Sequence, residues 1–286
     1  MIVIPKPEKP SNQTNGHHPI SLLTVISEVF EKIILSRLNS IIHEKNLLPS
    51  IQFGFRTNHS TIEQINRVTD TILQAIENKE FAPTVFLDVS CAFDKVWHED
   101  LIHKLQGKIP DCFCLLVASY LSNRTFEVHI GTESTEPKRI AAGVPQGSIL
   151  GPVLFLLYTM DFPQAEEITT ALYADDSAVI AHHKNYDIAT SCLQNAVDRI
   201  HNWAQDWKIG LNESKSVRID FTLRPHRYTP TMLAGKAIPY AENARYLGLH
   251  IDSKLNWRHH VNLKRKQLNI LLKKFIGSSA SILSSK

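Results

Sequence analysis

The stretch that decides the fold is "ALYADDSAVIA", residues 171–181, in which two adjacent aspartates separate two short apolar runs. The pattern predicts a strand, a tight turn and a second strand over residues 169–181. Aspartate is a common turn residue, so the pair Asp175–Asp176 is compatible with an ordinary polar β-turn. The apolar neighbours indicate more, because a charge beside buried strands is costly unless it is paired or binds a cation.

A second aspartate lies in the same kind of context. Residues 84–89, TVFLDV, predict a buried strand that carries Asp88. If the two strands are neighbours, their carboxylates meet and repel one another unless divalent cations bind between them. Oxygen ligands suit Mg²⁺, and two Mg²⁺ ions about 4 Å apart are the usual device of phosphoryl transfer. The residues alone leave both interpretations open, a polar turn and a phosphoryl-transfer metal site.

The rest of the chain alternates between helical and strand patterns. Apolar residues at intervals of three and four predict helices over 20–45, 59–80, 93–106, 111–122, 148–160, 187–206 and 258–276. Runs of β-branched or alternating apolar residues predict strands over 2–4, 84–89, 125–131, 216–223 and 244–252, with 137–144 as a partner for 125–131. Ser21 and Ser60 or Thr61 are expected to open the first two helices, and Ser148 either caps the helix after it or is a solvated turn residue.

Composition excludes two classes of protein. Hydrophobic residues make up 43% and charged residues 21% of the 286 residues, which is typical of a globular protein and argues against disorder. The longest apolar runs, 112–121 and 153–160, are shorter than the roughly 20 residues that a bilayer-spanning helix needs. Pro5 and the nearby charges make the N-terminus untypical of a signal peptide. We therefore expect an intracellular protein, in the nucleus or cytoplasm, without a membrane partner.

Charge is unevenly distributed along the chain. Residues 224–286 hold 12 Lys or Arg and two acidic residues, a net charge of +10, whereas the whole chain carries +3, which leaves −7 on residues 1–223. A basic segment of this kind favours a polyanionic partner such as nucleic acid. The alternative is an ordinary solvated helix face.

Seven motifs in order carry a resemblance that covers nearly the whole chain. They are IPKPEKP (4–10) with HHPISLL (17–23), QFGFRTNHST (52–61), FLDVSCAFDKVWH (86–98), AGVPQGSILGP (142–152), YADD (173–176), LNESKS (211–216) and YLGLHID (246–252). This set resembles the reverse transcriptase domain of non-LTR (LINE-type) retrotransposons, and among these the Jockey elements of insects. One YxDD would be weak evidence, but seven motifs in the family's order are strong evidence.

The resemblance implies an α/β (α+β) right-hand polymerase, with an antiparallel palm sheet backed by helices, helical fingers and a truncated thumb. We expect the fingers at 1–80, the palm with a fingers insertion at 81–253 and the start of the thumb at 254–286. Relative to the family, the chain begins within the fingers, ends early in the thumb, and lacks an endonuclease domain and a Cys/His knuckle. We therefore expect a fragment or a decayed copy of an element.

The implied chemistry is RNA-directed DNA synthesis, in which a primer 3′-hydroxyl attacks the α-phosphate of a deoxynucleoside triphosphate on an RNA template. By resemblance, Asp88 and Asp175 would bind two Mg²⁺ ions, with Mn²⁺ as a substitute, and Asp176 would complete the acidic cluster. The backbone of Val89 would reach the second ion or the triphosphate. Lys215 resembles the lysine that protonates the departing pyrophosphate; the alternative is a surface lysine.

Further residues would bind substrate or primer by the same resemblance. Phe93 falls where the family places an aromatic ring under the sugar, so it would exclude a 2′-hydroxyl; the alternative is an ordinary core phenylalanine. Arg56 would help to hold nucleic acid or would make a structural salt bridge. The other matching positions are Lys6 at the triphosphate, Gln146 and Gly147 near nucleotide and template, and Tyr246, Leu247 and Gly248 in the primer-grip turn. His18 replaces the family's arginine, so we expect weaker triphosphate binding.

Two other functions compete with this interpretation. A catalytically inactive, nucleic-acid-binding remnant of a retrotransposon would keep the fold and the basic segment without DNA synthesis. A maturase or telomerase is a third possibility, which "AFDKVWH" and "SILGPVLFLLYTMDFP" disfavour. The oligomeric state and the template RNA stay open.

Overall fold

The computed structural model describes residues 2–5, 17–21, 23–130 and 133–283. Its helices are α1 (Val25–Glu44), α2 (Thr61–Glu77), the 3₁₀ turn η2 (Phe93–Lys95), α3 (His98–Leu105), α4 (Asp111–Leu121), α5 (Gly151–Tyr158), α6 (Tyr186–Asp206) and α7 (Arg258–Leu283). Its strands are β1 (Ile2–Pro5), β2 (His17–Ile20), β3 (Ala82–Ser90), β4 (Thr125–Phe126), β5 (His129–Ile130), β6 (Glu133–Ser134), β7 (Lys138–Arg139), β8 (Ile168–Tyr173), β9 (Asp176–Ala181), β10 (Gly210–Phe221), β11 (Met232–Leu233), β12 (Lys236–Ala237), β13 (Asn243–Tyr246) and β14 (Leu249–Asp252).

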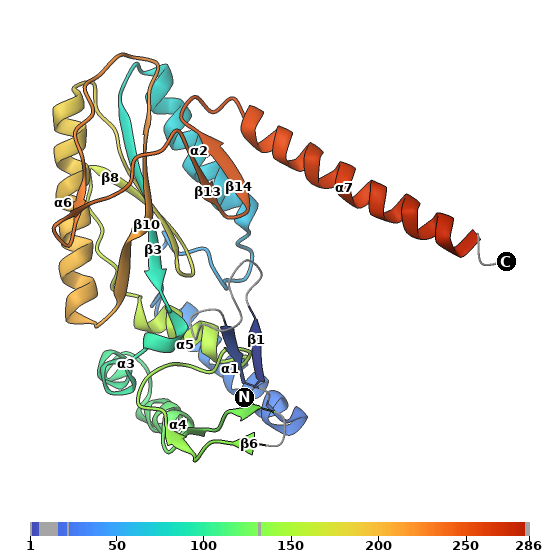
Figure 1. Ribbon diagram of the computed structural model, residues 1–286. Helices are drawn as coiled ribbons and strands as arrows, with labels where there is room; N and C mark the ends of the chain where they lie inside the picture. The colour runs from blue at the N-terminus through green and yellow to red at the C-terminus, as the bar shows by residue number, and fades with distance from the viewer. Residues whose placement is uncertain (1, 6–16, 22, 131–132, 284–286) are drawn as a thin grey trace.

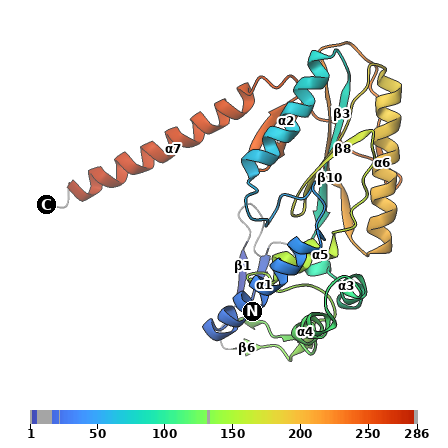
Figure 2. The ribbon, with the colours of Figure 1, turned by 180° about the vertical axis from the view of Figure 1, so that it is seen from behind.

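A four-stranded antiparallel sheet in the order β10-β3-β9-β8 forms the centre of the larger unit. Helix α2 covers one face of this sheet and α6 covers the other (Figures 1 and 2). Successive residues of a strand point to opposite faces, so Phe86 packs into the α2 layer while Val85 and Leu87 pack into the α6 layer. Burial on both faces explains why β3 reads as a continuous apolar run.

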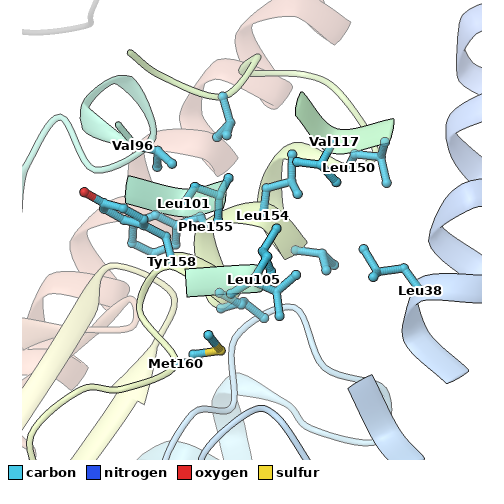
Figure 3. Packing of buried hydrophobic residues seen from close by; sticks show 14 of the residues in the cluster. Leu38, Val96, Leu101, Leu105, Val117, Leu150, Leu154, Phe155, Tyr158 and Met160 are labelled. Carbon is cyan, nitrogen blue, oxygen red and sulfur yellow. The ribbon is translucent and has the colours of Figure 1, made fainter. Parts of the chain in front are cut away.

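A second, mainly helical unit lies at the end of the sheet toward which β3 points (Figure 1). Its core joins α1, α3, α4 and α5, and Figure 3 shows Leu38 of α1, Leu101 and Leu105 of α3 and Leu154 of α5 converging there. These four leucines are fully buried. At roughly 25 cal/mol per Å² of buried apolar surface, each contributes about 2 kcal/mol. The sequence from 151 to 158 is apolar on all sides because α5 is enclosed by this core.

The ends of several helices test the expected signals. Ser60 and Glu63 form a reciprocal capping box at the start of α2, as expected. The expected cap of the first helix is wrong: Thr24, not Ser21, accepts a hydrogen bond from Ser27 N, and Ser21 N instead donates to Gln146 O. Ser148 Oγ accepts from Gly151 N at 2.9 Å, which satisfies a free N–H at the start of α5.

Several expected elements have different bounds, among them the strand expected over 244–252, which is the pair β13 and β14. The single helix expected over 93–106 is the short turn η2 followed by α3. The strand expected over 216–223 is longer, because β10 begins at Gly210 and contains a bulge between Asn212 and Val217. The expected pairing of 125–131 with 137–144 occurs only in part, as β4 with β7, because β5 pairs with β6 instead.

The expected fold class is confirmed, an α+β chain with an antiparallel sheet backed by helices. Helix α1 packs with α3–α5, whereas α2 packs on the sheet, so residues 1–80 contribute to both packing units. Helix α7 projects from the rest of the molecule (Figure 1). Among the described residues, no helix has the length and apolar character that crossing a membrane requires.

Candidate active site

The hairpin of β8 and β9 carries two of the three expected aspartates. Tyr173 pairs with Asp176, so Ala174 and Asp175 form a two-residue turn. Ala174 has φ +57°, a value that the first central position of a type II′ hairpin turn requires and that glycine usually supplies. The turn therefore places Asp175 at its tip and Asp176 at the first position of β9.

Strand β3 brings the third aspartate to the same place. Leu87 pairs with Ser177, so the next residues of these antiparallel strands, Asp88 and Asp176, are neighbours across the ladder. On the other side of β3, Asp88 pairs with Asn212 of β10. The bulge in β10 lets Ser216 Oγ accept a hydrogen bond from Asp88 N at 3.1 Å. Asp88 and the adjacent pair Asp175–Asp176, which are far from it in sequence, thus lie at one end of the sheet.

The electrostatics of the carboxylates reflect this proximity. Partial desolvation raises the pKa of Asp175, and the charge of Asp88 raises it further. Desolvation raises the pKa of Asp176 to about 6, with additional repulsion from Asp175 and Asp88 and an opposing effect of Arg245. Mutual repulsion of this kind is relieved when a cation binds between the carboxylates.

The donor set suits a divalent cation. The Oδ2 atom of Asp88 is buried and has no hydrogen-bond partner. Carboxylate oxygens are the ligands that Mg²⁺ prefers. Among the described residues, no three His, Cys, Asp or Glu side chains are already grouped closely enough to hold a metal ion by themselves. The residues therefore fit a cation by the chemistry of their carboxylates and by this oxygen, which accepts no hydrogen bond.

Lys215 lies beside Asp88, although 127 residues separate them in sequence. Its Nζ is 3.7 Å from Asp88 Oδ2, and its side chain is 59% exposed. Asn212 Oδ1 accepts from the backbone N of Lys215 and of Ser214, which folds the bulge of β10 back toward the aspartate. Lys215 thus places an exposed cation on a long side chain at the edge of the acidic cluster and is not an isolated surface residue.

The expected substrate residues from two motifs lie together. Phe93 is half-buried, and its O accepts from Val144 N at 2.8 Å, which joins the two motif loops. Gln146 Nε2 donates to Asp94 Oδ1 at 3.0 Å, and Gly147 is exposed next to it. Val89 follows Asp88 in β3 and is half-buried.

The remaining expected residues have mixed positions. Arg56 donates through one guanidinium nitrogen to the carbonyls of Pro49 and Gln52, so this nitrogen holds its own loop together. Leu247 and Gly248 form the two-residue turn between β13 and β14, both with positive φ, whereas Tyr246 is the buried last residue of β13. Lys6 lies outside the described residues, as does the side chain of His18.

Some residues that contact the site were not expected. Gln52 contacts the turn residue Ala174, and Gly54 lies against the same turn. Glu31 of α1 is buried and accepts from the backbone N of Ile149 and Leu150 and from Tyr120 Oη, which ties α1 to the segment after Gln146. The sequence does carry one signal for these two residues, because each is a polar residue among apolar neighbours. Gln52 stands in QFGFR, and Glu31 stands in an apolar helix.

Comparison with known proteins gives consistent results. Residues 4–251 match the family model "Reverse transcriptase (RNA-dependent DNA polymerase)". A probable RNA-directed DNA polymerase from transposon X-element of Drosophila melanogaster is 38% identical over 99% of this chain and 32% of the relative. The RNA-directed DNA polymerase from the mobile element jockey of the same species is 37% identical over 91% of this chain and 29% of the relative.

The chain spans about a third of the length of these curated relatives. Among solved structures, a telomerase from Candida tropicalis in complex with a TWJ fragment of telomeric RNA has a TM-score of 0.52 at 14% identity, covering 82% of this chain and 37% of that one, a likeness of fold alone. The expected resemblance to Jockey-type sequences is confirmed, and members of the matching family are generally metal-dependent. The chain belongs to the reverse transcriptase (RNA-dependent DNA polymerase) family.

Proposed function

We propose that this chain is the polymerase region of an RNA-directed DNA polymerase of retrotransposon origin. Its partners are an RNA template, a DNA primer and deoxynucleoside triphosphates. The observation that carries the proposal is the convergence of Asp88, Asp175 and Asp176 at one end of the sheet, in a chain whose relatives are named RNA-directed DNA polymerases. The partners named for the relatives are extended to this chain as part of the proposal.

The acidic cluster is proposed to bind two Mg²⁺ ions, with Mn²⁺ as a substitute. Asp88 and Asp175 hold both ions, Asp176 completes the cluster, and the backbone of Val89 lies beside it. When bound, such ions lower the pKa of the primer hydroxyl and neutralise the triphosphate. Desolvation is the main reason that the pKa of Asp175 and of Asp176 is raised, and bound cations would offset the additional repulsion between the carboxylates.

Lys215 is proposed to give a proton to the departing pyrophosphate. Its exposed side chain and the 3.7 Å distance between its Nζ and Asp88 Oδ2 support this role, because the amine can move from the carboxylate to a bound triphosphate. Lys6 and Arg56 contribute positive charge toward the substrate, Arg56 through the guanidinium atoms that its loop does not use. Leu247 and Gly248 present a tight turn to the primer strand, and the buried Tyr246 anchors the strand that leads into this turn.

Primer extension tests the proposed function. The full chain is given a DNA primer on an RNA template with Mg²⁺, and Asp175→Asn is compared with Asp206→Asn, an exposed aspartate at the end of α6. We expect Asp175→Asn to lose extension by about 100-fold or more, the usual cost of removing one charge-stabilising group. The Asp206→Asn variant should extend like the wild type.

A second outcome identifies the inactive remnant. Salt-sensitive binding of the primer–template without extension, in Mg²⁺ and in Mn²⁺, would contradict the polymerase proposal and favour a nucleic-acid-binding protein. Equal extension by wild type and Asp175→Asn would show that the measured activity comes from a contaminant or from another site.

A further inference from the structure

Residues 51–54, the segment before α2, run along the outer edge of the β8–β9 hairpin. Phe53 N donates to Leu172 O at 2.8 Å, and Leu172 N donates to Ile51 O at 3.0 Å, which forms a parallel bridge around Gln52. Strand β8 is the edge of the sheet, so this segment pairs with backbone groups that would otherwise be free. Gln64 of α2, fully buried, donates to Leu172 O and Ile51 O and fixes the segment from the other side.

Gln52 binds both backbone polar groups of the turn residue Ala174. Its side chain is buried, with 2% of its surface exposed. Its Oε1 accepts from Ala174 N at 2.9 Å and from Gly54 N at 2.8 Å, and its Nε2 donates weakly to Ala174 O at 3.4 Å. One side chain therefore joins the turn to the segment that carries Gly54.

Gly54 allows the backbone of this segment to touch the turn. A Cβ atom at Gly54 would lie 2.2 Å from Ala174 N and 2.9 Å from the carbonyl carbon of Tyr173. Real Cβ atoms do not approach backbone atoms so closely, so any other residue would displace either the segment or the turn. The contact is with backbone, which cannot move aside as a flexible side chain can.

The turn needs this support because its geometry is unfavourable for its sequence. Ala174 has φ +57°, which is strained for a residue with a Cβ atom. Such conformations persist where the surrounding structure over-determines them. Ala174 directly precedes Asp175 and lies two residues before Asp176, so a change in its backbone moves both carboxylates relative to Asp88.

We propose that Gln52 and Gly54 are positioning residues, which hold the turn of the β8–β9 hairpin so that Asp175 and Asp176 face Asp88. The expected loss of activity rests on the proposed polymerase function. The expected loosening of the turn rests only on the hydrogen bonds of Gln52. Both residues act through the backbone of the turn and not through contact with the substrate. Their loss lowers the rate of chemistry more than the affinity for nucleotide.

The first test compares three glutamine variants of the full chain. Gln52→Met keeps the length of the side chain and removes both kinds of hydrogen bond, whereas Gln52→Glu keeps the acceptor for Ala174 N and Gly54 N. Gln194→Met is the matched control, because Gln194 binds the N and O of Met232 in the same two-sided way, on α6 and away from the site. Melting curves and far-UV circular dichroism establish that each variant is folded.

We expect Gln52→Met to lower kcat about 10- to 100-fold, the usual effect of slight misplacement of reacting groups, with KM for nucleotide within about twofold of the wild type. Gln52→Glu should recover part of kcat, and Gln194→Met should leave it unchanged. Gly54→Ala should lower kcat in the same way by displacing the turn. An unchanged kcat in Gln52→Met, or an equal loss in Gln194→Met, would overturn the proposal.

Amide hydrogen exchange separates this proposal from the proposed function. In Gln52→Met the amide of Ala174 should exchange at least about tenfold faster than in the wild type, while amides in the centre of β3 and β9 keep their protection. If the wild type does not extend a primer, the polymerase function fails and the exchange result still decides whether Gln52 holds the turn. Unchanged exchange at Ala174 would overturn the positioning role even in an active enzyme.

Discussion

At the scale of single residues, Phe93, in the motif of residues 86–98, has its ring fixed by two aromatic neighbours. Its ring centroid is 5.0 Å from that of Phe155, which is buried in the helical core, and 6.2 Å from that of the exposed Phe55. Aromatic contacts at these distances stabilise one ring position. A ring that is held from one side by the core and half-exposed on the other can form a rigid wall at the position proposed for the sugar.

The prediction at this scale concerns sugar selection. Phe93→Val removes the wall, so we expect the ratio of ribonucleotide to deoxynucleotide kcat/KM to rise by about tenfold or more, since relief of a clash is worth at least 1.4 kcal/mol at that ratio. Single-nucleotide extension measures the ratio. Phe113→Val, which removes a half-buried ring from α4, is the control and should not change it. An unchanged ratio in Phe93→Val would assign Phe93 to the core alone.

At the scale of elements, Lys104 of α3 joins the helical unit to the end of α6. Its Nζ donates to Tyr158 O at 2.6 Å and to Asp161 Oδ1 at 2.5 Å, and lies 3.6 Å from the centroid of the Trp207 ring. The side chain is 2% exposed. Burial lowers the pKa of Lys104 to about 8, against the partly compensating charge of Asp161. The junction thus holds a cation whose charge is costly to bury.

This cost predicts a stability that depends on pH. The folded-state pKa is about 8 and the unfolded value is 10.5, so between these values the unfolded chain binds more protons and the free energy of unfolding rises with pH. Relative to its value below pH 8, the free energy of unfolding gains about 3 kcal/mol from this group above pH 10.5, at roughly 1.36 kcal/mol per pKa unit. Denaturant unfolding of the wild type and of Lys104→Met measures this effect. The free energy of unfolding of the wild type minus that of the variant should rise between pH 8 and 10.5, and the effects of other titrating groups cancel in the subtraction. A difference that stays constant between pH 8 and 10.5 would contradict the prediction.

The elements also explain what the sequence could predict about the fold and the site. The hairpin, β3 and the start of α2 carry local signals, which are apolar runs around Asp88 and Asp175 and the Ser60–Glu63 capping box. The acidic cluster followed from placing two such strands side by side. Gln52 was not predicted because its hydrogen bonds reach Ala174, 122 residues away, through backbone groups that have no sequence signature. The η2 turn was missed for a similar reason, since pairing of Val144 and Gly143 with 93–96 interrupts a helical pattern.

At the scale of the whole molecule, the basic part of the chain includes the helix that projects from an acidic body. The acidic residues at the site lie on a body whose first 223 residues carry −7, while +10 is concentrated after residue 223. Helix α7 extends away from this body (Figure 2), and Lys264, Arg265 and Lys266 on it are exposed. A basic arm beside an acidic, cation-binding centre can attract a nucleic acid duplex while the metal ions offset the repulsion near the aspartates.

The last prediction concerns the salt dependence of this attraction. Neutralising Lys264, Arg265 and Lys266 together to Gln should weaken binding of an RNA–DNA primer–template at low salt. It should also lower the slope of log K against log salt by about 2–3, roughly 0.9 for each lost phosphate contact. The loss should be equal for unrelated template sequences, because phosphate contacts carry no sequence information. Fluorescence anisotropy from 50 to 200 mM salt, about the range in which such contacts matter, measures both. A control with Lys45, Lys79 and Lys184 changed to Gln removes three exposed charges elsewhere and should keep the wild-type slope; equal slopes in both triple variants would mean that α7 does not contact the duplex.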